Sequence, residues 1–241
     1  MMKLIYPKAR SSFSDGDMMF IEQTLASDEH SRKSLRNLMQ HRDMMDIVLD
    51  NPKLLDAVLA GRGSGNVSVR LFYYLAIRYE LRHVGVEDRG VADYMTEFLM
   101  TYVPEPRMGI LMSGGAFDYR YVIGMKQALD EANEEQRFIL NSRIANYALM
   151  VCALCPERIR KHLIPGVPQA NDPEFFAELS SAHFKLAADA RLAWEHDLKD
   201  VYREIDRRWP AIRSALSDFA RQFLLVDKIP AEQSAVKSLR D

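Results

Sequence analysis

The sequence predicts an all-α protein, a multi-helix bundle of about eight to ten helices. Two observations on the pattern carry this prediction: apolar residues recur every three to four positions over most of the chain, and no stretch alternates polar and apolar residues as a half-buried strand would. The composition of the 241 residues, 48% apolar and 27% charged with 11 Gly and 10 Pro, is that of a globular chain, not of a collagen-like or disordered one. A chain of this length can bury a sizeable core.

The helices expected in the first half span residues 17–27, 31–49 as one helix or two, 53–60, 67–83 and 87–103. Asp15 or Asp17 is the expected N-cap of the first helix. Pro52 falls in the first turn of the helix near residue 53, where its missing N–H is harmless. Residues 67–83 are apolar around most of the circumference, which predicts a central core helix. The following helix should pack against it through one apolar face: Val91, Met95, Phe98 and Tyr102.

In the second half, helices are expected over residues 119–129, 134–155, 173–194, 198–209 and from 210 onward. We expect one helical domain over residues 14–228. Proline and glycine residues punctuate 104–118, which is the candidate boundary if this domain divides into two lobes. Residues 229–241 are charged and small, and are expected to form a flexible C-terminal tail.

Cysteine content and charge limit the compartment and the partners. Cys152 and Cys155 are too few for a disulfide scaffold and fit a reducing compartment, so we expect a cytoplasmic protein. Residues 1–13 lack the apolar stretch of a secretory signal, and the longest apolar run, 147–155, falls short of the roughly 20 residues that span a bilayer. We therefore expect no membrane association. The net charge of −2 removes the electrostatic basis for nonspecific nucleic-acid binding.

Glu80 and His83 form the candidate metal site. Spaced three residues apart on a predicted helix, they can project to one side and ligate iron, manganese or zinc; di-iron carboxylate bundles use such a unit twice, with two further glutamates. No second copy is found here, and the alternative is an ordinary helix-end histidine with a charged neighbour. In that case no cofactor is expected. Carboxylates that could complete a site are those of Asp93, Glu97, Glu135 and Glu195.

Three other patterns have simpler explanations than chemistry. The spacing of Cys152 and Cys155 matches a redox or zinc half-site, but the pair ends a helix, where the helix dipole does not lower a thiol pKa; packing in the core is preferred. His196-Asp197 matches the dipeptide of metal-dependent HD phosphohydrolases without further support nearby. The glycine-rich residues 61–66 could offer N–H groups to an anion, or form an interhelical loop.

Aromatic residues suggest a small-molecule pocket as a further hypothesis. An apolar cavity with a few phenol groups is an ordinary ligand site, whereas the same side chains more often only pack in a core. The candidate pocket residues are Tyr73, Tyr74, Tyr79 and Tyr94.

Residues 68–99 contain Tyr73, Tyr74, Arg78, the turn Val86-Glu87-Asp88-Arg89 and Ala92-Asp93-Tyr94, and are followed by Ile144-Ala145-Asn146-Tyr147-Ala148-Leu149 and Cys155-Pro156-Glu157-Arg158. In these features the chain resembles a family of uncharacterised helical bacterial proteins, over about residues 35–225. The shared motifs are mainly apolar helix faces. The resemblance implies a bacterial, soluble protein and transfers no activity and no functional residue.

We therefore expect a noncatalytic binding or regulatory module that uses a cleft or an apolar helical face, either with a protein partner or as a homodimer. Seven of the 13 methionines fall within the first 45 residues, and flexible thioethers suit an adaptable binding surface. The alternatives are a metal-dependent oxidase or hydrolase centred on Glu80 and His83, and a small-molecule pocket at the four tyrosines.

Overall fold

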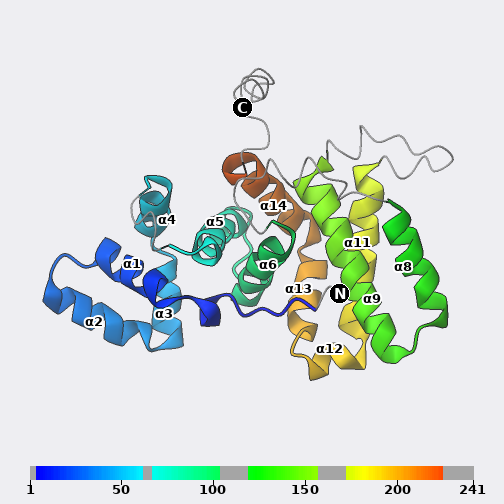
Figure 1. Cartoon of the computed structure of the whole chain (residues 1–241), viewed down its shortest axis with the longest axis horizontal. Helices are drawn as coiled ribbons and strands as arrows, with labels where there is room; N and C mark the ends of the chain where they lie inside the picture. The colour runs from blue at the N-terminus through cyan, green and yellow to red at the C-terminus, as the bar shows by residue number, and fades with distance from the viewer. Residues whose placement is uncertain (1–3, 62–66, 104–118, 157–171, 225–241) are drawn as a thin grey trace, which may run out of the picture. The chain divides into compact units, whose positions relative to one another are not determined.

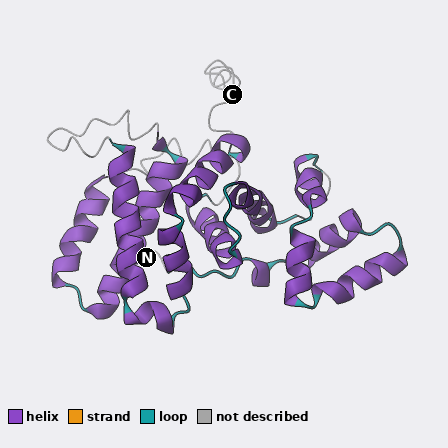
Figure 2. Ribbon diagram, turned by 180° about the vertical axis from the view of Figure 1, so that it is seen from behind, coloured by secondary structure: helices purple, strands orange, loops and turns teal. Residues whose placement is uncertain are grey.

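The computed structural model describes residues 4–61, 67–103, 119–156 and 172–224 (Figure 1). Within these ranges the regular elements are helices and no strand is present (Figure 2), so the all-α prediction is confirmed. The chain divides into two compact units, an N-terminal unit of Ile5–Pro104 and a C-terminal unit of Glu105–Asp241 with Met1–Leu4. The candidate boundary 104–118 and the expected tail 229–241 lie outside the described residues.

The described residues form twelve α-helices, so the predicted eight to ten is wrong in number. One extra helix arises because residues 173–194 form two helices: Ala190 between them has extended backbone (φ −69°, ψ 140°). Alanine favours helix, so the apolar pattern gives no sign of this break. The other arises in residues 31–49, which take the two-helix alternative and separate at His41, where the backbone is again extended (φ −96°, ψ 125°).

The N-terminal unit begins with a short 3-10 turn and continues with α-helices. The elements are η1 (Arg10–Ser12), α1 (Asp15–Leu25), α2 (Glu29–Met39), α3 (Arg42–Leu49), α4 (Pro52–Leu59), α5 (Val69–His83) and α6 (Arg89–Tyr102).

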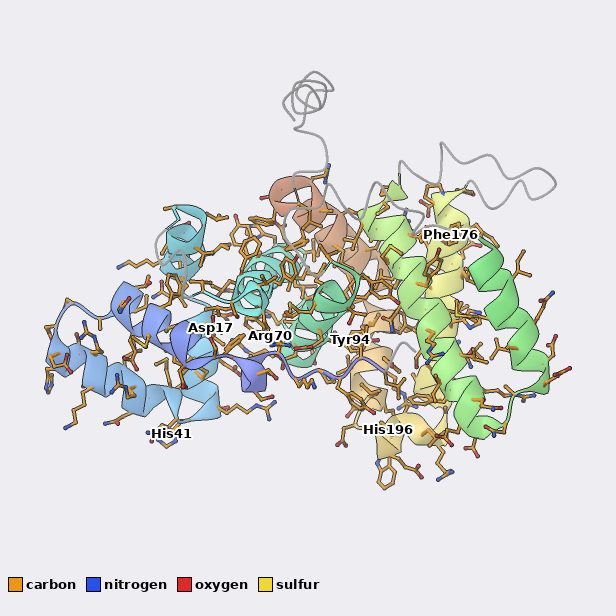
Figure 3. The ribbon with its side chains drawn as sticks, in the orientation of Figure 1. Asp17, His41, Arg70, Tyr94, Phe176 and His196 are labelled. Atoms are coloured by element: carbon orange, nitrogen blue, oxygen red, sulfur yellow. The ribbon has the colours of Figure 1, made fainter. Side chains whose placement is uncertain are left out.

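Polar residues fix where these helices begin. The sequence predicted Asp15 or Asp17 as the N-cap of α1, but the N-cap is Ser14. Asp17, three residues later, is its partner in a capping box. The carboxylate of the buried Asp17 (labelled in Figure 3) also accepts hydrogen bonds from the backbone N and Oγ of Ser68, at 2.7 and 2.8 Å. Asp17 thereby joins the starts of α1 and α5. Pro52 occupies the first turn of α4, as predicted, behind the N-cap Asn51.

The core of the N-terminal unit lies where α5 packs against α6. On α5, Tyr73, Tyr74, Ala76, Ile77 and Leu81 are fully buried, which confirms the central position predicted for this helix. The predicted face of α6 is buried as well, and consists of Val91, Met95, Phe98 and Tyr102. Burial of a large apolar side chain contributes about 1.5–3 kcal/mol, so this pair of helices supplies much of the stability of the unit.

The C-terminal unit is built around α9, which contacts both α8 and α11. Its described elements are α8 (Tyr119–Glu131), α9 (Glu134–Leu149), the π-helical turn η2 (Met150–Leu154), α11 (Pro173–Asp189), α12 (Arg191–Glu195), α13 (Lys199–Arg207) and α14 (Trp209–Phe223). Aromatic side chains fill its core, namely Phe138, Phe176, Phe184, Tyr202 and Phe219 (Phe176 in Figure 3).

The last turn of the helix predicted over residues 134–155 is a π turn, which begins at Met150. Such turns leave backbone carbonyls without their usual α-helical partner. The hydroxyl of Ser217 on α14 donates to the carbonyl of Ala153 at 3.0 Å. Cys152 and Cys155 are buried here as free thiols, and burial raises the pKa of Cys152 to about 12. They pack in the core, as the sequence indicated.

None of the helices in the described ranges is both long and apolar enough to cross a membrane.

Candidate functional site

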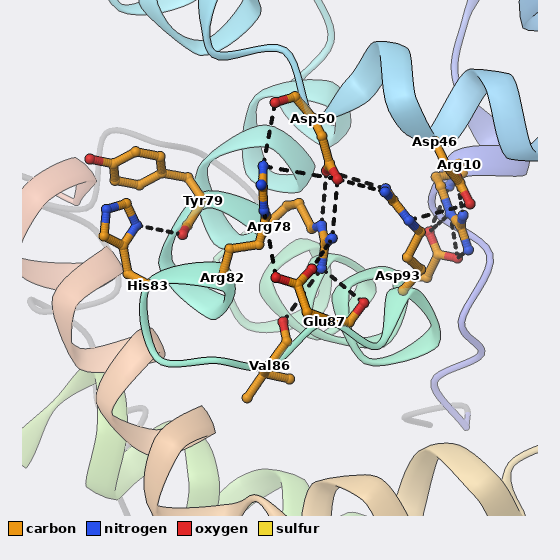
Figure 4. A network of polar contacts seen from close by, with 11 residues as sticks. Arg10, Asp46, Asp50, Arg78, Tyr79, Arg82, His83, Val86, Glu87 and Asp93 are labelled. Atoms are coloured by element: carbon orange, nitrogen blue, oxygen red, sulfur yellow. Dashed lines mark hydrogen bonds and ion pairs between the residues drawn. The ribbon is translucent and has the colours of Figure 1, made fainter.

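Arginines and carboxylates of the N-terminal unit form a continuous chain of ion pairs, which we call the arginine ladder (Figure 4). Its members come from the segment before α1, from α3 and the turn after it, from α5, from the turn between α5 and α6, and from the first turns of α6. They are Arg10, Asp46, Asp50, Arg78, Arg82, Glu87, Arg89 and Asp93.

At one end of the ladder, Arg10 binds Asp93 of α6. The Arg10 guanidinium donates to both Asp93 oxygens at 2.8–3.2 Å, and its backbone N–H donates to Oδ1 at 3.0 Å. Arg10 also pairs with Asp46 of α3. Burial raises the pKa of Asp93, and the bonds from Arg10 oppose that shift. This end fastens the N-terminal segment to α3 and α6.

At the other end, Arg78 holds the turn between α3 and α4 against α5. Its side chain is only 3% exposed, and it donates to both oxygens of Asp50 at 3.0 and 3.2 Å and to the Glu87 carboxylate at 2.7 Å. Arg89 binds the same Asp50 oxygens at 3.2 and 2.6 Å. Burial on its own would raise the pKa of Asp50, but these two guanidinium groups outweigh it and hold the pKa below its ordinary value.

Beside this end of the ladder lies a hollow of about 450 Å³, which we call the α4–α5 hollow. Its apolar wall is made by Leu49, Pro52, Leu55 and Leu75. Its polar lining residues are Asp50, Asn51, Arg78, Tyr79, Arg82, His83 and Glu87. Small-molecule sites in proteins commonly enclose about 300–1,000 Å³ with apolar walls and a few polar groups, so the hollow has the size and lining of such a site.

Arg82 is held more loosely than its neighbours in the ladder. Its guanidinium lies 3.9 Å from Oδ2 of Asp50 and 3.8 Å from Oε1 of Glu87, and it donates to the backbone carbonyl of Asp50 at 3.4 Å. The side chain is 45% exposed. Charge-assisted hydrogen bonds are normally 2.7–2.9 Å long, so most of the donor capacity of Arg82 is not used by these contacts.

Tyr79 and His83 stand one turn apart at the edge of the hollow (Figure 4), with ring centroids 4.1 Å apart. Nδ1 of His83 lies 2.9 Å from the carbonyl oxygen of Tyr79. A carbonyl oxygen only accepts, so Nδ1 carries a proton and donates. The other ring nitrogen, Nε2, is thereby left as the one that can accept when the ring is neutral.

A second hollow of about 560 Å³ lies beside the Arg10 end of the ladder. Its lining includes three methionines, Met18, Met39 and Met45, together with Phe13, Arg42 and Asp46. Its two carboxylates, those of Asp46 and Asp93, are bound by Arg10. The wall is less apolar than that of the α4–α5 hollow, which is therefore the better candidate site.

The structure does not bring the four predicted tyrosines together in one pocket. Tyr73, Tyr74 and Tyr94 are fully buried; the hydroxyl of Tyr73 donates to the carbonyl of Val103 at 2.7 Å, and burial raises the pKa of Tyr74 to about 12. Tyr79 is 42% exposed and lines the α4–α5 hollow. At about 100° per residue, Tyr79 points roughly 120° away from Tyr73 and 140° away from Tyr74 round the helix, so it lies on a different face.

The candidate metal ligands Glu80 and His83 occupy different environments. Glu80 is buried at 4% exposure, whereas His83 is exposed and lines the hollow. In the part of the chain that the structure describes, no three His, Cys, Asp or Glu side chains are grouped so as to hold a metal ion. The metal site therefore stays a hypothesis that the structure neither completes nor tests.

Two other patterns lie wholly or partly in the described residues. The ring of His196 stacks on Phe138 with centroids 5.8 Å apart, while Asp197 is exposed in a turn with φ +55°. Of the glycine-rich stretch 61–66, all but Gly61 lies outside the described residues.

Comparison of the chain with protein-family models, with curated proteins and with solved structures finds no match. The resemblance to a helical bacterial family stays a prediction.

Proposed function

We propose that this chain is a noncatalytic binding module whose ligand is a small molecule held in the α4–α5 hollow. One observation carries the proposal: a hollow of about 450 Å³ combines an apolar wall of leucines with a guanidinium, a phenol and an imidazole. Tight binding favours a site that is already formed before the ligand arrives. Arg78 supplies that rigidity here, since it holds two lining residues of the hollow, Asp50 and Glu87.

A fragment screen by ligand-observed NMR, with a pair of neighbouring variants, tests this proposal. Pro52 is exposed and lines the hollow, whereas Lys53 is exposed and does not line it. Pro52→Trp should obstruct the hollow and abolish most fragment binding, while Lys53→Trp should leave it unchanged. Circular dichroism of both variants checks the fold. A screen without hits, or hits that persist equally in both variants, would refute the proposal.

The apolar side chains exposed on α1–α4 support a second binding surface, for another copy of this chain. Among the described residues, five of the eight exposed large apolar side chains lie on these helices: Met19, Leu38, Met44, Ile47 and Leu59. Large exposed apolar side chains mark an interaction surface where they form a contiguous patch. We propose that these exposed side chains mediate homodimer formation, and that the module works in the bacterial cytoplasm.

Sedimentation velocity over a range of protein concentrations tests the dimer. Ile47→Glu, at a side chain 65% exposed on α3, should shift the equilibrium to monomer. Leu186→Glu, at a side chain 54% exposed on α11 of the C-terminal unit, is the matched control and should have no effect. A protein that stays monomeric at all concentrations would contradict the proposal.

A further inference from the structure

We propose that the ligand of the α4–α5 hollow is an amphipathic anion, in which a carboxylate or phosphate ester pairs with Arg82 and a hydrocarbon body lies on the leucine wall. This inference rests on the proposed function, and adds the chemical class of the ligand. The evidence is the difference in hydrogen-bond and ion-pair distances among the charged side chains that line the hollow.

The two carboxylates of the hollow are already paired. Asp50 accepts four hydrogen bonds of 2.6–3.2 Å from Arg78 and Arg89. Glu87 accepts from Arg78 at 2.7 Å. A carboxylate with short bonds from guanidinium groups has little attraction left for a cationic ligand, because its charge is compensated at close range. The hollow therefore offers no strong site for an amine.

Arg82 is the arginine of the hollow that has no short ion pair with either carboxylate. Both carboxylates within reach of it are bound at short distance by other arginines, and its own distances to them are 3.8 and 3.9 Å. With the side chain 45% exposed at the hollow, the guanidinium can turn to a ligand oxygen without breaking a short ion pair. A planar guanidinium binds a carboxylate or a phosphate through two parallel hydrogen bonds.

The rest of the lining fits the remaining parts of such a ligand. The phenol of Tyr79 is a further donor at the edge of the hollow. Leu49, Leu55 and Leu75 offer aliphatic surface and no hydrogen-bonding group, which suits an acyl or alkyl chain. Each methylene transferred from water to such a wall tightens binding by up to about fourfold. The anion gives orientation and the hydrocarbon gives most of the affinity.

Titration of the full chain with four probes of one chain length tests the inference. The probes are octanoate, octyl phosphate, octanamide and octylamine, each kept below its aggregation concentration and followed by calorimetry. We expect one or both anions to bind about tenfold or more tightly than the amide and the amine, since a charge-assisted hydrogen bond commonly contributes that much. The better of the two anions identifies the headgroup as carboxylate or phosphate.

Variants locate the effect at Arg82. Arg82→Gln should weaken anion binding about tenfold and leave octanamide binding unchanged, and Arg82→Lys should give an intermediate value. Arg207→Gln, at an exposed arginine paired with Glu204 in the C-terminal unit, is the matched control and should change nothing.

The failures of the two proposals are distinguishable. If all four probes bind equally in the hollow, or if Arg82→Gln has no effect, the anionic ligand is excluded while the binding module stands. If octylamine binds best, the assignment of charge is wrong. If no probe binds and the fragment screen also gives no hits, both the anionic ligand and the proposed binding function are refuted.

Discussion

Replacing Arg78 with methionine should destabilise the N-terminal unit by about 3 kcal/mol. The side chain is 3% exposed and donates five hydrogen bonds to described residues: two to Asp50, one to the Glu87 carboxylate, and two to the carbonyls of Val86 and Glu87. Methionine keeps an unbranched apolar side chain but donates none of these bonds.

The magnitude follows from what each partner loses. Removing one member of a buried ion pair commonly costs 3–5 kcal/mol, because the other charge stays buried without compensation. Asp50 keeps its two bonds to Arg89, and the Glu87 side chain, 68% exposed, returns to water, so the lower end of that range applies. The buried or partly buried backbone carbonyls of Val86 and Glu87 each lose a hydrogen-bond donor, which adds to the loss of folding free energy.

Hydrogen–deuterium exchange of the most protected α5 amides measures this change within the N-terminal unit. A loss of about 3 kcal/mol corresponds to exchange about 150-fold faster. Arg207→Met, which removes an exposed pair with Glu204, is the control and should change stability by less than about 0.5 kcal/mol. An acceleration in Arg78→Met below about tenfold, or equal to that of the control, would show that the ladder does not hold the unit together.

Three further predictions concern other sites. Burial, and then the charge of Lys126, lowers the pKa of His183 to about 4. Because an unfolded histidine titrates near 6.5, the neutral buried His183 contributes its full stability above that pH, and the free energy of unfolding falls by up to about 3 kcal/mol as the pH drops to 4. Urea unfolding at several pH values should show that the free energy of unfolding falls more steeply with decreasing pH in the wild type than in His183→Gln. Equal pH dependence in the two proteins would contradict this prediction. Asp17→Ala should cost about 3 kcal/mol in urea unfolding, since it leaves the N–H groups of Ser14 and Ser68 without their acceptor; a loss under about 1 kcal/mol would oppose this account. Elemental analysis should find iron, manganese and zinc below one per chain, whereas stoichiometric metal that disappears in His83→Ala would favour the metal-dependent enzyme.

The apolar pattern predicted the helical fold because it reports local periodicity. Residues 67–83 are apolar on most sides, and α5 is accordingly buried against α6. Breaks without glycine or proline escaped prediction: Ala190 separates α11 from α12 although alanine is the best helix former. At the start of α1 we expected Asp15 or Asp17 as the N-cap, and the structure instead has Ser14 as the N-cap with Asp17 as its capping-box partner.

The candidate site was less predictable because its contacts join distant parts of the chain. Arg78 meets Asp50 across 28 residues, Arg89 meets Asp50 across 39, and Arg10 meets Asp93 across 83. Spacing along one helix gives no information on such pairs. Of the predicted pocket tyrosines, Tyr79 lines the α4–α5 hollow; its neighbour His83 lines the same hollow, although its spacing from Glu80 suggested a metal ligand.

Members of the ladder nevertheless stood out in the sequence. Arg78, Glu87, Arg89 and Asp93 all belong to the motifs that carry the resemblance to helical bacterial proteins. The structure gives these polar positions a physical role: Arg78, Glu87 and Arg89 fix the turns beside the α4–α5 hollow, and Asp93 holds the N-terminal segment through Arg10.

The most direct test of the central claim is a titration of the methyl-labelled protein with octanoate and octyl phosphate, followed by NMR. We predict saturable shifts of the leucine methyl groups of Leu49, Leu55 and Leu75, which line the hollow, with no change at Leu186 in the C-terminal unit. Shifts that are absent at these three leucines, or that are spread equally over both units, would contradict the assignment of the hollow as the site of an amphipathic anion.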